Sequence, residues 1–189
     1  YIVHGEGEIS WRELLRRLTN KENVRDSPGV SFLKSDGTLH KNPESPLARP
    51  VDDLPFPAWD LFPMDAYILY KHESAKHTAR CFPVLYSRGC PQSCNFCYRL
   101  YDSYRLRSFE NVFEEIRILR DKYHVDHIDF VDENIGINEK AAIRFATAMK
   151  EADLGVTWNC HGTTPACTVK ALTAMKDAGM TAINIGIEA

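Results

Sequence analysis

Residues 81–98 read CFPVLYSRGCPQSCNFCY. The first nine residues are mostly apolar and end at a glycine, which is typical of a buried strand that runs into a loop. The loop carries Cys90, Cys94 and Cys97 in the spacing C-x3-C-x2-C. A disulfide framework needs an even number of cysteines, and a structural zinc site needs four ligands. Three thiols on one loop therefore indicate either a different metal site or a zinc site completed from elsewhere.

Beyond this loop, segments with the helical period alternate with short apolar runs. Amphipathic helices are predicted at 108–123, with Ser108 as the N-cap, at 138–152, and at 168–179, with Gly179 as the C-terminal stop. Buried strands are predicted at 125–134, 156–162 and 181–189. Alternation of this kind is typical of βα units on a parallel sheet. Together with the run at 81–89, the sequence predicts an α/β fold with four parallel strands and three helices.

Polar residues gather where these predicted strands end. They occur at 88–98, at 132–134, at 161–164 and at Glu188. In parallel α/β folds, ligands bind at the carboxyl ends of the strands. The sequence therefore predicts that all four groups face one site.

The first 63 residues are organised differently. A short apolar run leads into a helix for which Ser10 is the predicted N-cap, in a capping box. Its apolar stripe consists of Trp11, Leu14, Leu15 and Leu18. Residues 31–42 have the pattern of a hairpin with an Asp-Gly turn. Residues 42–63 hold six prolines, a density that excludes a regular helix or a central strand and indicates a domain junction.

Length and charge narrow the class of protein. The 189 residues carry a net charge of −3 and have a pI near 6.2, whereas nucleic-acid binders usually have a basic excess. Apolar runs are too short for a membrane span, and the chain does not start like a signal peptide. The six cysteines are therefore expected to be reduced thiols in the cytoplasm. Because Tyr1 is not a natural start, we expect a piece of a longer chain.

Iron–sulfur chemistry accounts for the three thiols better than zinc does. A cluster ordinarily takes one cysteine per iron, so a cubane held by three cysteines leaves one iron open to another ligand. A catalyst can use that open position. The alternative is a zinc site completed by Cys81, Cys160 or His161. Cys160 and Cys167 are otherwise expected to be structural, because buried free cysteine behaves as a small apolar residue.

The cysteine motif, with Phe96 before its last cysteine, resembles the signature of the radical S-adenosylmethionine (SAM) enzymes. The resemblance runs from about His4 to Ala189 and points to the branch that typically carries an N-terminal cobalamin-binding domain. The stretches that carry it are HGEGE (4–8), DDLPFPAWDLFPMDAY (52–67), SRGCP (87–91), YRLRSFENVFEEI (104–116), the acidic pair Asp132-Glu133 and KDAGMTAINIGIEA (176–189).

The resemblance implies a cofactor set and a reaction. Cys90, Cys94 and Cys97 would bind a 4Fe–4S cluster whose open iron is chelated by SAM. An electron from a reducing partner such as flavodoxin or ferredoxin would cleave SAM, and the resulting radical would abstract hydrogen from a small-molecule substrate. The implied SAM contacts are Phe96 to the adenine, Asp132, Glu133 and Asn134 to the amino group, and Glu188 to the ribose.

The resemblance also implies how the chain is divided. Residues 1–20 would be the C-terminal tail of a Rossmann-like domain of the cobalamin-binding type, and residues 21–77 a hairpin and a proline-rich linker. Residues 78–189 would be the N-terminal part of a parallel radical SAM barrel, with about four of its six strands. Cobalamin itself would be bound by an upstream domain outside this chain.

Methylation of an unactivated carbon is the outcome that the cobalamin-type resemblance favours. Oxidative cyclisation or rearrangement is the next alternative within the family. The stretch YRLYDSYRLRS (98–108) interleaves arginine with tyrosine, as nucleic-acid grooves do, which leaves transfer-RNA modification as another alternative. Outside the family, the alternative is a non-catalytic zinc-binding module.

Overall fold

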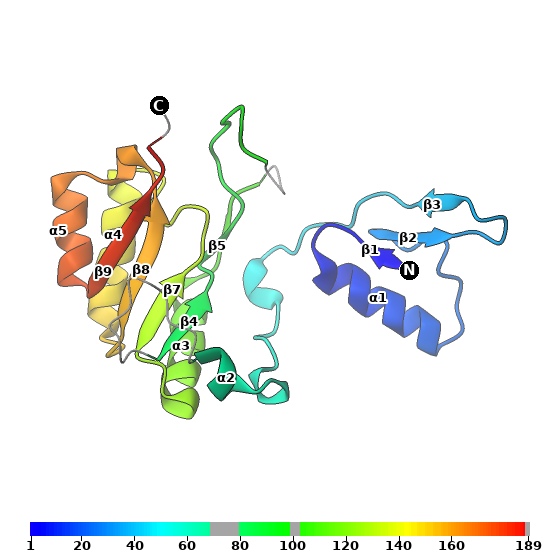
Figure 1. The fold of residues 1–189 in the computed structure, drawn as a ribbon, viewed down its shortest axis with the longest axis horizontal. Coiled ribbons are helices and arrows are strands. Elements are labelled where there is room, and N and C mark those ends of the chain that lie inside the picture. Colours follow the sequence, from blue (N-terminus) through cyan, green and yellow to red (C-terminus); the bar gives the residue numbers. More distant parts are fainter. Residues whose placement is uncertain (69–79, 99–102, 188–189) are drawn as a thin grey trace. The chain divides into compact units, whose positions relative to one another are not determined.

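The computed structural model describes residues 1–68, 80–98 and 103–187. The chain forms two compact units, residues 1–55 and residues 56–189 (Figure 1). Within the described residues, no helix has both the length and the apolar character that a bilayer span requires. The cysteine loop belongs to the second unit.

The first unit holds a three-stranded antiparallel sheet. Strand β2 (Val30–Leu33) pairs with both β1 (Ile2–Val3) and β3 (Leu39–Lys41). The predicted hairpin is confirmed, because β2 and β3 are joined by a turn in which the Lys34 amide donates to the Thr38 carbonyl at 2.9 Å. Gly37 in this turn has a φ of 80°, which glycine adopts without steric strain.

The predicted N-cap of the first helix is wrong. Helix α1 (Gly7–Thr19) begins three residues before Ser10, and its N-cap is Glu6. Ser10 is buried within the helix and packs against Gly29. A Cβ added to Gly29 would collide with the Ser10 hydroxyl. This close tertiary approach overrides the local capping signal. Of the predicted apolar stripe, only Leu14 is buried, whereas Trp11, Leu15 and Leu18 are exposed.

The proline-rich segment contains only short elements. Two 3-10 turns, η1 (Val51–Asp53) and η2 (Trp59–Leu61), are followed by the short helix α2 (Met64–Ile68). The prediction that 42–63 contains neither a regular helix nor a central strand is confirmed.

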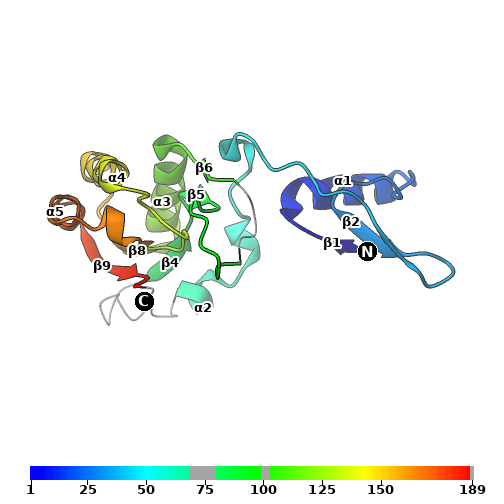
Figure 2. The same ribbon diagram turned by 90° about the horizontal axis from the view of Figure 1, so that it is seen from above.

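The second unit is built on a four-stranded parallel sheet in the order β4-β7-β8-β9. Its strands are β4 (Cys81–Val84), β7 (His127–Phe130), β8 (Thr157–Gly162) and β9 (Met180–Ile185). Three helices follow strands in the chain: α3 (Phe109–Tyr123), α4 (Glu139–Ala152) and α5 (Val169–Asp177). They cover one face of the sheet (Figure 2). The predicted α/β fold with a parallel sheet is confirmed.

Local signals set the limits of these helices. Ser108 is the N-cap of α3, as predicted, and its hydroxyl accepts a hydrogen bond from the Asn111 amide at 3.1 Å. Asn138 caps α4 in the same way at 3.0 Å. Gly179, which was predicted to stop the third helix, follows α5 with a φ of 93°.

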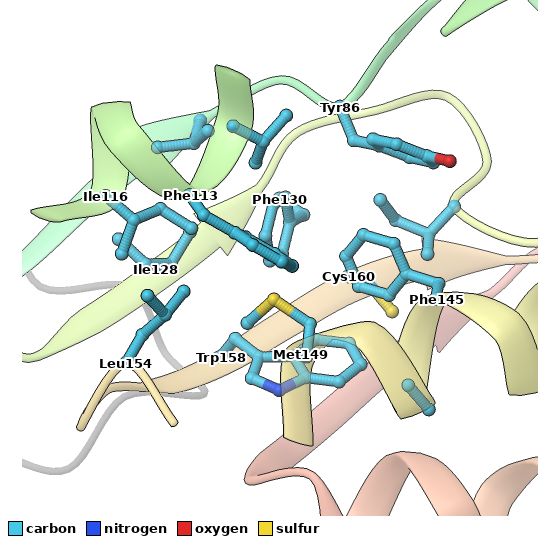
Figure 3. Packing of buried hydrophobic residues seen from close by; sticks show 14 of the residues in the cluster. Tyr86, Phe113, Ile116, Ile128, Phe130, Phe145, Met149, Leu154, Trp158 and Cys160 are labelled. Atoms are coloured by element: carbon cyan, nitrogen blue, oxygen red, sulfur yellow. The ribbon is translucent and has the colours of Figure 1, made fainter. Parts of the chain in front are cut away.

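The core lies between the sheet and its helices and is rich in aromatic side chains (Figure 3). The ring of Phe145 on α4 meets Phe130 and Trp158 edge to face, with centroids 5.2 and 5.4 Å apart. Cys160 is completely buried among these residues, and burial raises the pKa of its thiol. The expectation that Cys160 is a core residue is confirmed.

Polar side chains link β7 and β8 to each other. His127 Nε2 donates to Asn159 Oδ1 at 2.7 Å, and the side-chain nitrogen Nδ2 of Asn159 donates to Asp129 Oδ1 at 2.5 Å. His127 Nδ1 also lies 2.8 Å from the Thr157 hydroxyl. Because side chains alternate along a strand, these four residues share the face opposite to that of core residues Ile128, Phe130, Trp158 and Cys160.

Candidate functional site: the cysteine loop

A two-stranded ribbon closes the base of the cysteine loop. Strand β5 (Ser87–Arg88) pairs antiparallel with β6 (Arg105–Leu106), with Ser87 opposite Leu106. All three cysteines lie between these strands, so the loop is held at both of its ends.

The three cysteines of the loop are free thiols. Cys90 is partly buried, and Cys94 and Cys97 are exposed. The Cys97 amide donates to the Cys94 carbonyl at 3.2 Å, which forms a tight turn between the last two cysteines. Gly89, directly before Cys90, has a φ of 78°, a conformation that would strain most other residues.

The donor set of this loop fits an iron–sulfur cluster. Iron–sulfur clusters are held by cysteine thiolates, and the loop presents three reduced thiols within eight residues. The thiols are not gathered into a binding arrangement in the structure. Within 1–68, 80–98 and 103–187, no three His, Cys, Asp or Glu side chains are grouped so that they could hold a metal ion. Binding therefore requires the cysteine side chains to converge.

Asp132 lies at the base of the loop, and its carboxylate is buried. It accepts hydrogen bonds from the Tyr86 amide at 3.0 and 3.1 Å. The amide and the hydroxyl of Ser87 donate to the same carboxylate. Burial raises the pKa of Asp132 from 3.8 to about 6, although these hydrogen bonds act in the opposite direction.

The two residues after Asp132 have different environments. Glu133 is exposed, whereas Asn134 is buried. The side-chain oxygen Oδ1 of Asn134 accepts a hydrogen bond from the backbone amide of Gly136 at 3.1 Å. The side-chain nitrogen Nδ2 of Asn134 donates to the Thr163 hydroxyl at 3.4 Å. The residues that follow β4, β7 and β8 are thus brought together, as the sequence predicted, at the carboxyl ends of these strands. That Asp132, Glu133 and Asn134 contact SAM stays a prediction.

Phe96 and Glu188 are the two remaining predicted SAM contacts. Phe96 is 67% exposed on the cysteine loop. Glu188, the predicted ribose contact, lies outside the described residues, as do Arg99 and Tyr101 of the arginine- and tyrosine-rich stretch. Among the alternative zinc ligands, Cys160 is enclosed in the core.

A buried ion pair below the loop was missed by the sequence reasoning. Arg107 Nη1 lies 2.5 Å from Glu115 on α3 and donates to the Leu85 carbonyl at 2.7 Å. The Arg107 amide donates to the Tyr86 carbonyl at 2.9 Å. Burial raises the pKa of Glu115, and Arg107 opposes this shift. The pair is eight residues apart in the sequence, which is not a spacing that signals contact.

Tyr104 lies close to the same residues. Its hydroxyl is hydrogen-bonded to Ser87, and burial raises its pKa to about 12. The charges of Asp132 and Cys90 add to this rise. Tyr104 therefore stays protonated at neutral pH and can donate a hydrogen bond at the base of the loop.

A family model described as the radical SAM superfamily matches residues 84–189. An uncharacterized methyltransferase of Pyrococcus horikoshii is 33% identical over 190 residues, which cover 99% of this chain and 40% of that protein. The anaerobic magnesium-protoporphyrin IX monomethyl ester cyclase of Rubrivivax gelatinosus is 28% identical over 197 residues, covering 100% of this chain and 34% of that protein. The chain thus spans well under half the length of these relatives.

Among solved structures, this chain is similar to OxsB, a cobalamin-dependent S-adenosylmethionine radical enzyme, solved with aqua-cobalamin and S-adenosylmethionine bound. The match has a TM-score of 0.74 and a sequence identity of 21%, and it covers 98% of this chain and 27% of OxsB. At this identity the likeness establishes a shared fold, and it spans both units of the chain.

Proposed function

We propose, because this chain belongs to the radical SAM superfamily, that the protein is an enzyme that reductively cleaves SAM to start radical chemistry on a small-molecule substrate. The observation that carries the proposal is the place of the C-x3-C-x2-C loop. The loop follows β4 and the short strand β5, and its base is hydrogen-bonded to Asp132, which lies after β7. Ligands of parallel α/β folds bind at this end of the sheet.

Cys90, Cys94 and Cys97 would hold a 4Fe–4S cluster that, when bound, supplies the electron for cleavage of SAM. Three cysteines leave one iron free for the amino and carboxylate groups of SAM. The exposed Glu133 carboxylate is suited to the ammonium group, because an ammonium donates to carboxylate oxygens. The exposed ring of Phe96 is available to the adenine. Glu188 is proposed as the ribose contact.

Methylation with help from cobalamin is the proposed outcome of the whole protein's reaction. The Pyrococcus horikoshii relative is named as a methyltransferase, which supports methylation. OxsB is described as cobalamin-dependent, which supports the use of cobalamin. We propose that residues 1–20 are the tail of a Rossmann-like, cobalamin-binding-type domain, with 21–77 as the hairpin and linker and 78–189 as the N-terminal part of the barrel. The exposed Trp11, Leu15 and Leu18 on α1 suit a helix that packs against further residues of such a domain.

Electron paramagnetic resonance of the anaerobically reconstituted and reduced protein tests the proposal. A 4Fe–4S signal that changes when SAM is added is the expected result. The Cys94→Ser variant should lose most of the signal, whereas Cys167→Ser, a cysteine outside the loop, should keep it. Uptake of zinc alone, or a cluster that does not respond to SAM, would contradict the radical SAM proposal and favour a metal-binding module.

Oxidative cyclisation is the second candidate function. It is favoured by the name of the Rubrivivax gelatinosus relative, a cyclase whose similarity covers 100% of this chain. Product analysis separates the two candidates, because methylation adds a labelled methyl group from SAM to the substrate and cyclisation does not.

A further inference from the structure

We propose that Asp132 is a positioning residue for the cysteine loop and not a ligand of SAM. In this arrangement, the neighbouring Glu133 supplies the carboxylate for the amino group of SAM. This inference rests on the proposed function and assigns different tasks to two adjacent acidic residues.

The first observation is the set of groups that donate hydrogen bonds to the Asp132 carboxylate. Donors from two consecutive residues, the Tyr86 amide and the amide and hydroxyl of Ser87, converge on it. All three donors reach Oδ1, and Oδ2 shares the Tyr86 amide. Asp132 is 1% exposed, so its remaining capacity is hidden from a ligand in solution.

The second observation is where the backbone ladder ends. Strand β7 pairs with β4 as far as Val84 and Phe130, and the Val131 amide donates to the Val84 carbonyl at 3.2 Å. Beyond this point the Asp132 side chain takes over as the acceptor for the buried amides of Tyr86 and Ser87. Buried amides without an acceptor destabilise the folded chain. Asp132 therefore extends the link between β7 and the chain that leads into the loop.

Arg107 is a second anchor for the same segment, residues 85–87. Arg107 holds the Leu85 carbonyl through its side chain and the Tyr86 carbonyl through its amide, and Glu115 holds Arg107. Residues 85–87 are consequently bonded to Asp132 beyond β7, to β6 and to Arg107, and Glu115 on α3 holds Arg107 in turn. Cys90 follows only three residues later, so the position of the first thiol depends directly on this anchored segment.

The third observation is the alternation of burial after β7. Residues 128, 130 and 132 are buried, residue 129 is half-buried, and residues 131 and 133 are exposed. Side chains of alternate residues point to opposite faces of an extended strand, and Asp132 continues the buried set of Ile128 and Phe130 just beyond the end of β7. Glu133 is open to solvent and therefore available to a ligand.

Iron retention against a chelator, measured on the full-length protein after anaerobic reconstitution, tests this inference. Asp132→Ala should lose iron about 10–100-fold faster than the wild type, as expected when a residue that orients metal ligands is removed. Asp132→Asn keeps an acceptor oxygen and should show a smaller loss. Glu133→Gln should retain iron like the wild type, but its resonance signal should no longer change with SAM.

Two further variants separate positioning from folding. Ile128→Val removes one buried methylene from β7 at a position that lies opposite Phe82, away from the hydrogen bonds of Asp132, so it should retain iron normally. Ser87→Ala removes the hydroxyl that donates to Asp132 and that is also hydrogen-bonded to Tyr104. It should speed iron loss with the SAM response intact, and it decides the question if Asp132→Ala does not fold, as judged by circular dichroism.

The outcomes also distinguish this inference from the proposed function. Wild-type iron retention in Asp132→Asn, Asp132→Ala and Ser87→Ala, with loss of the SAM response in the Asp132 variants, would make Asp132 a SAM ligand and overturn the inference. A wild-type protein that takes up no iron, or whose cluster ignores SAM, would overturn the proposed function instead.

Discussion

A single buried carboxylate, Asp132, makes the stability of the second unit depend on pH. Its pKa is raised from 3.8 to about 6 in the folded chain, so the folded chain holds a proton that the unfolded chain releases over this range. The contribution is fully present below the unfolded pKa and is lost as pH rises through the folded pKa. This contribution is about 3 kcal/mol, because the folded and unfolded pKa values of Asp132 differ by about two units.

Asp132→Asn should remove this pH dependence. We expect the free energy of unfolding of the wild type, relative to that of the variant, to fall between about pH 4 and about pH 6.5 and to stay level above that range. Urea titrations across this range measure it. A constant difference between the two proteins would show that Asp132 titrates normally.

Arg107 and Glu115 form a pair whose members depend on each other. Their side chains are 11% and 6% exposed. Removal of one partner leaves a buried, unpaired charge, so Arg107→Met should destabilise the protein by about 3–5 kcal/mol. The double variant Arg107→Met with Glu115→Leu should recover much of that loss. Chemical unfolding measures both changes, and a double variant no more stable than Arg107→Met would contradict this account.

At the scale of elements, helix α3 matters because it carries Glu115 and follows the loop directly. Its cap, Ser108, accepts the Asn111 amide. Ser108→Ala should lower the free energy of unfolding by about 1 kcal/mol, and Ser108→Asn, which can also cap, should restore most of it. Equal losses in both variants would show that Ser108 stabilises the helix by some other contact.

The helices and strands of the second unit could be predicted because their sequences carry clear periods and caps. Ser108 and Gly179 mark limits that the structure confirms. Ser10 failed as a cap because its packing against Gly29 depends on a tertiary contact that no local pattern records. The anchoring of Tyr86 and Ser87 by Asp132 also joins residues 45 and 46 positions apart, beyond the reach of spacing rules.

The different environments of Asp132 and Glu133 could not be predicted from the sequence. The alternation of Ile128, Asp129 and Phe130 is reversed by the apolar Val131 and the polar Asp132, so the pattern does not predict that Asp132 is buried. The convergence of the three thiols could not be predicted, because it depends on the metal that they bind.

At the scale of the molecule, cluster binding should stabilise only the unit that contains the loop. A ligand at 100 times its dissociation constant adds about 2.7 kcal/mol to the folded state. Hydrogen exchange on the reconstituted protein should therefore slow in 80–98 and 103–108, and not in β1, β2 or β3. Equal protection in both units, or protection that persists in Cys94→Ser, would contradict this localisation.

The strand order β4-β7-β8-β9 is also the order in which a ribosome makes these strands. Each strand pairs with the one made before it, so every βα unit that emerges meets an edge already in place. Asp132 follows β7 directly and reaches back to Ser87. A nascent chain can therefore fix the base of its cysteine loop while β8 and β9 are still being translated, and cluster insertion can begin during synthesis.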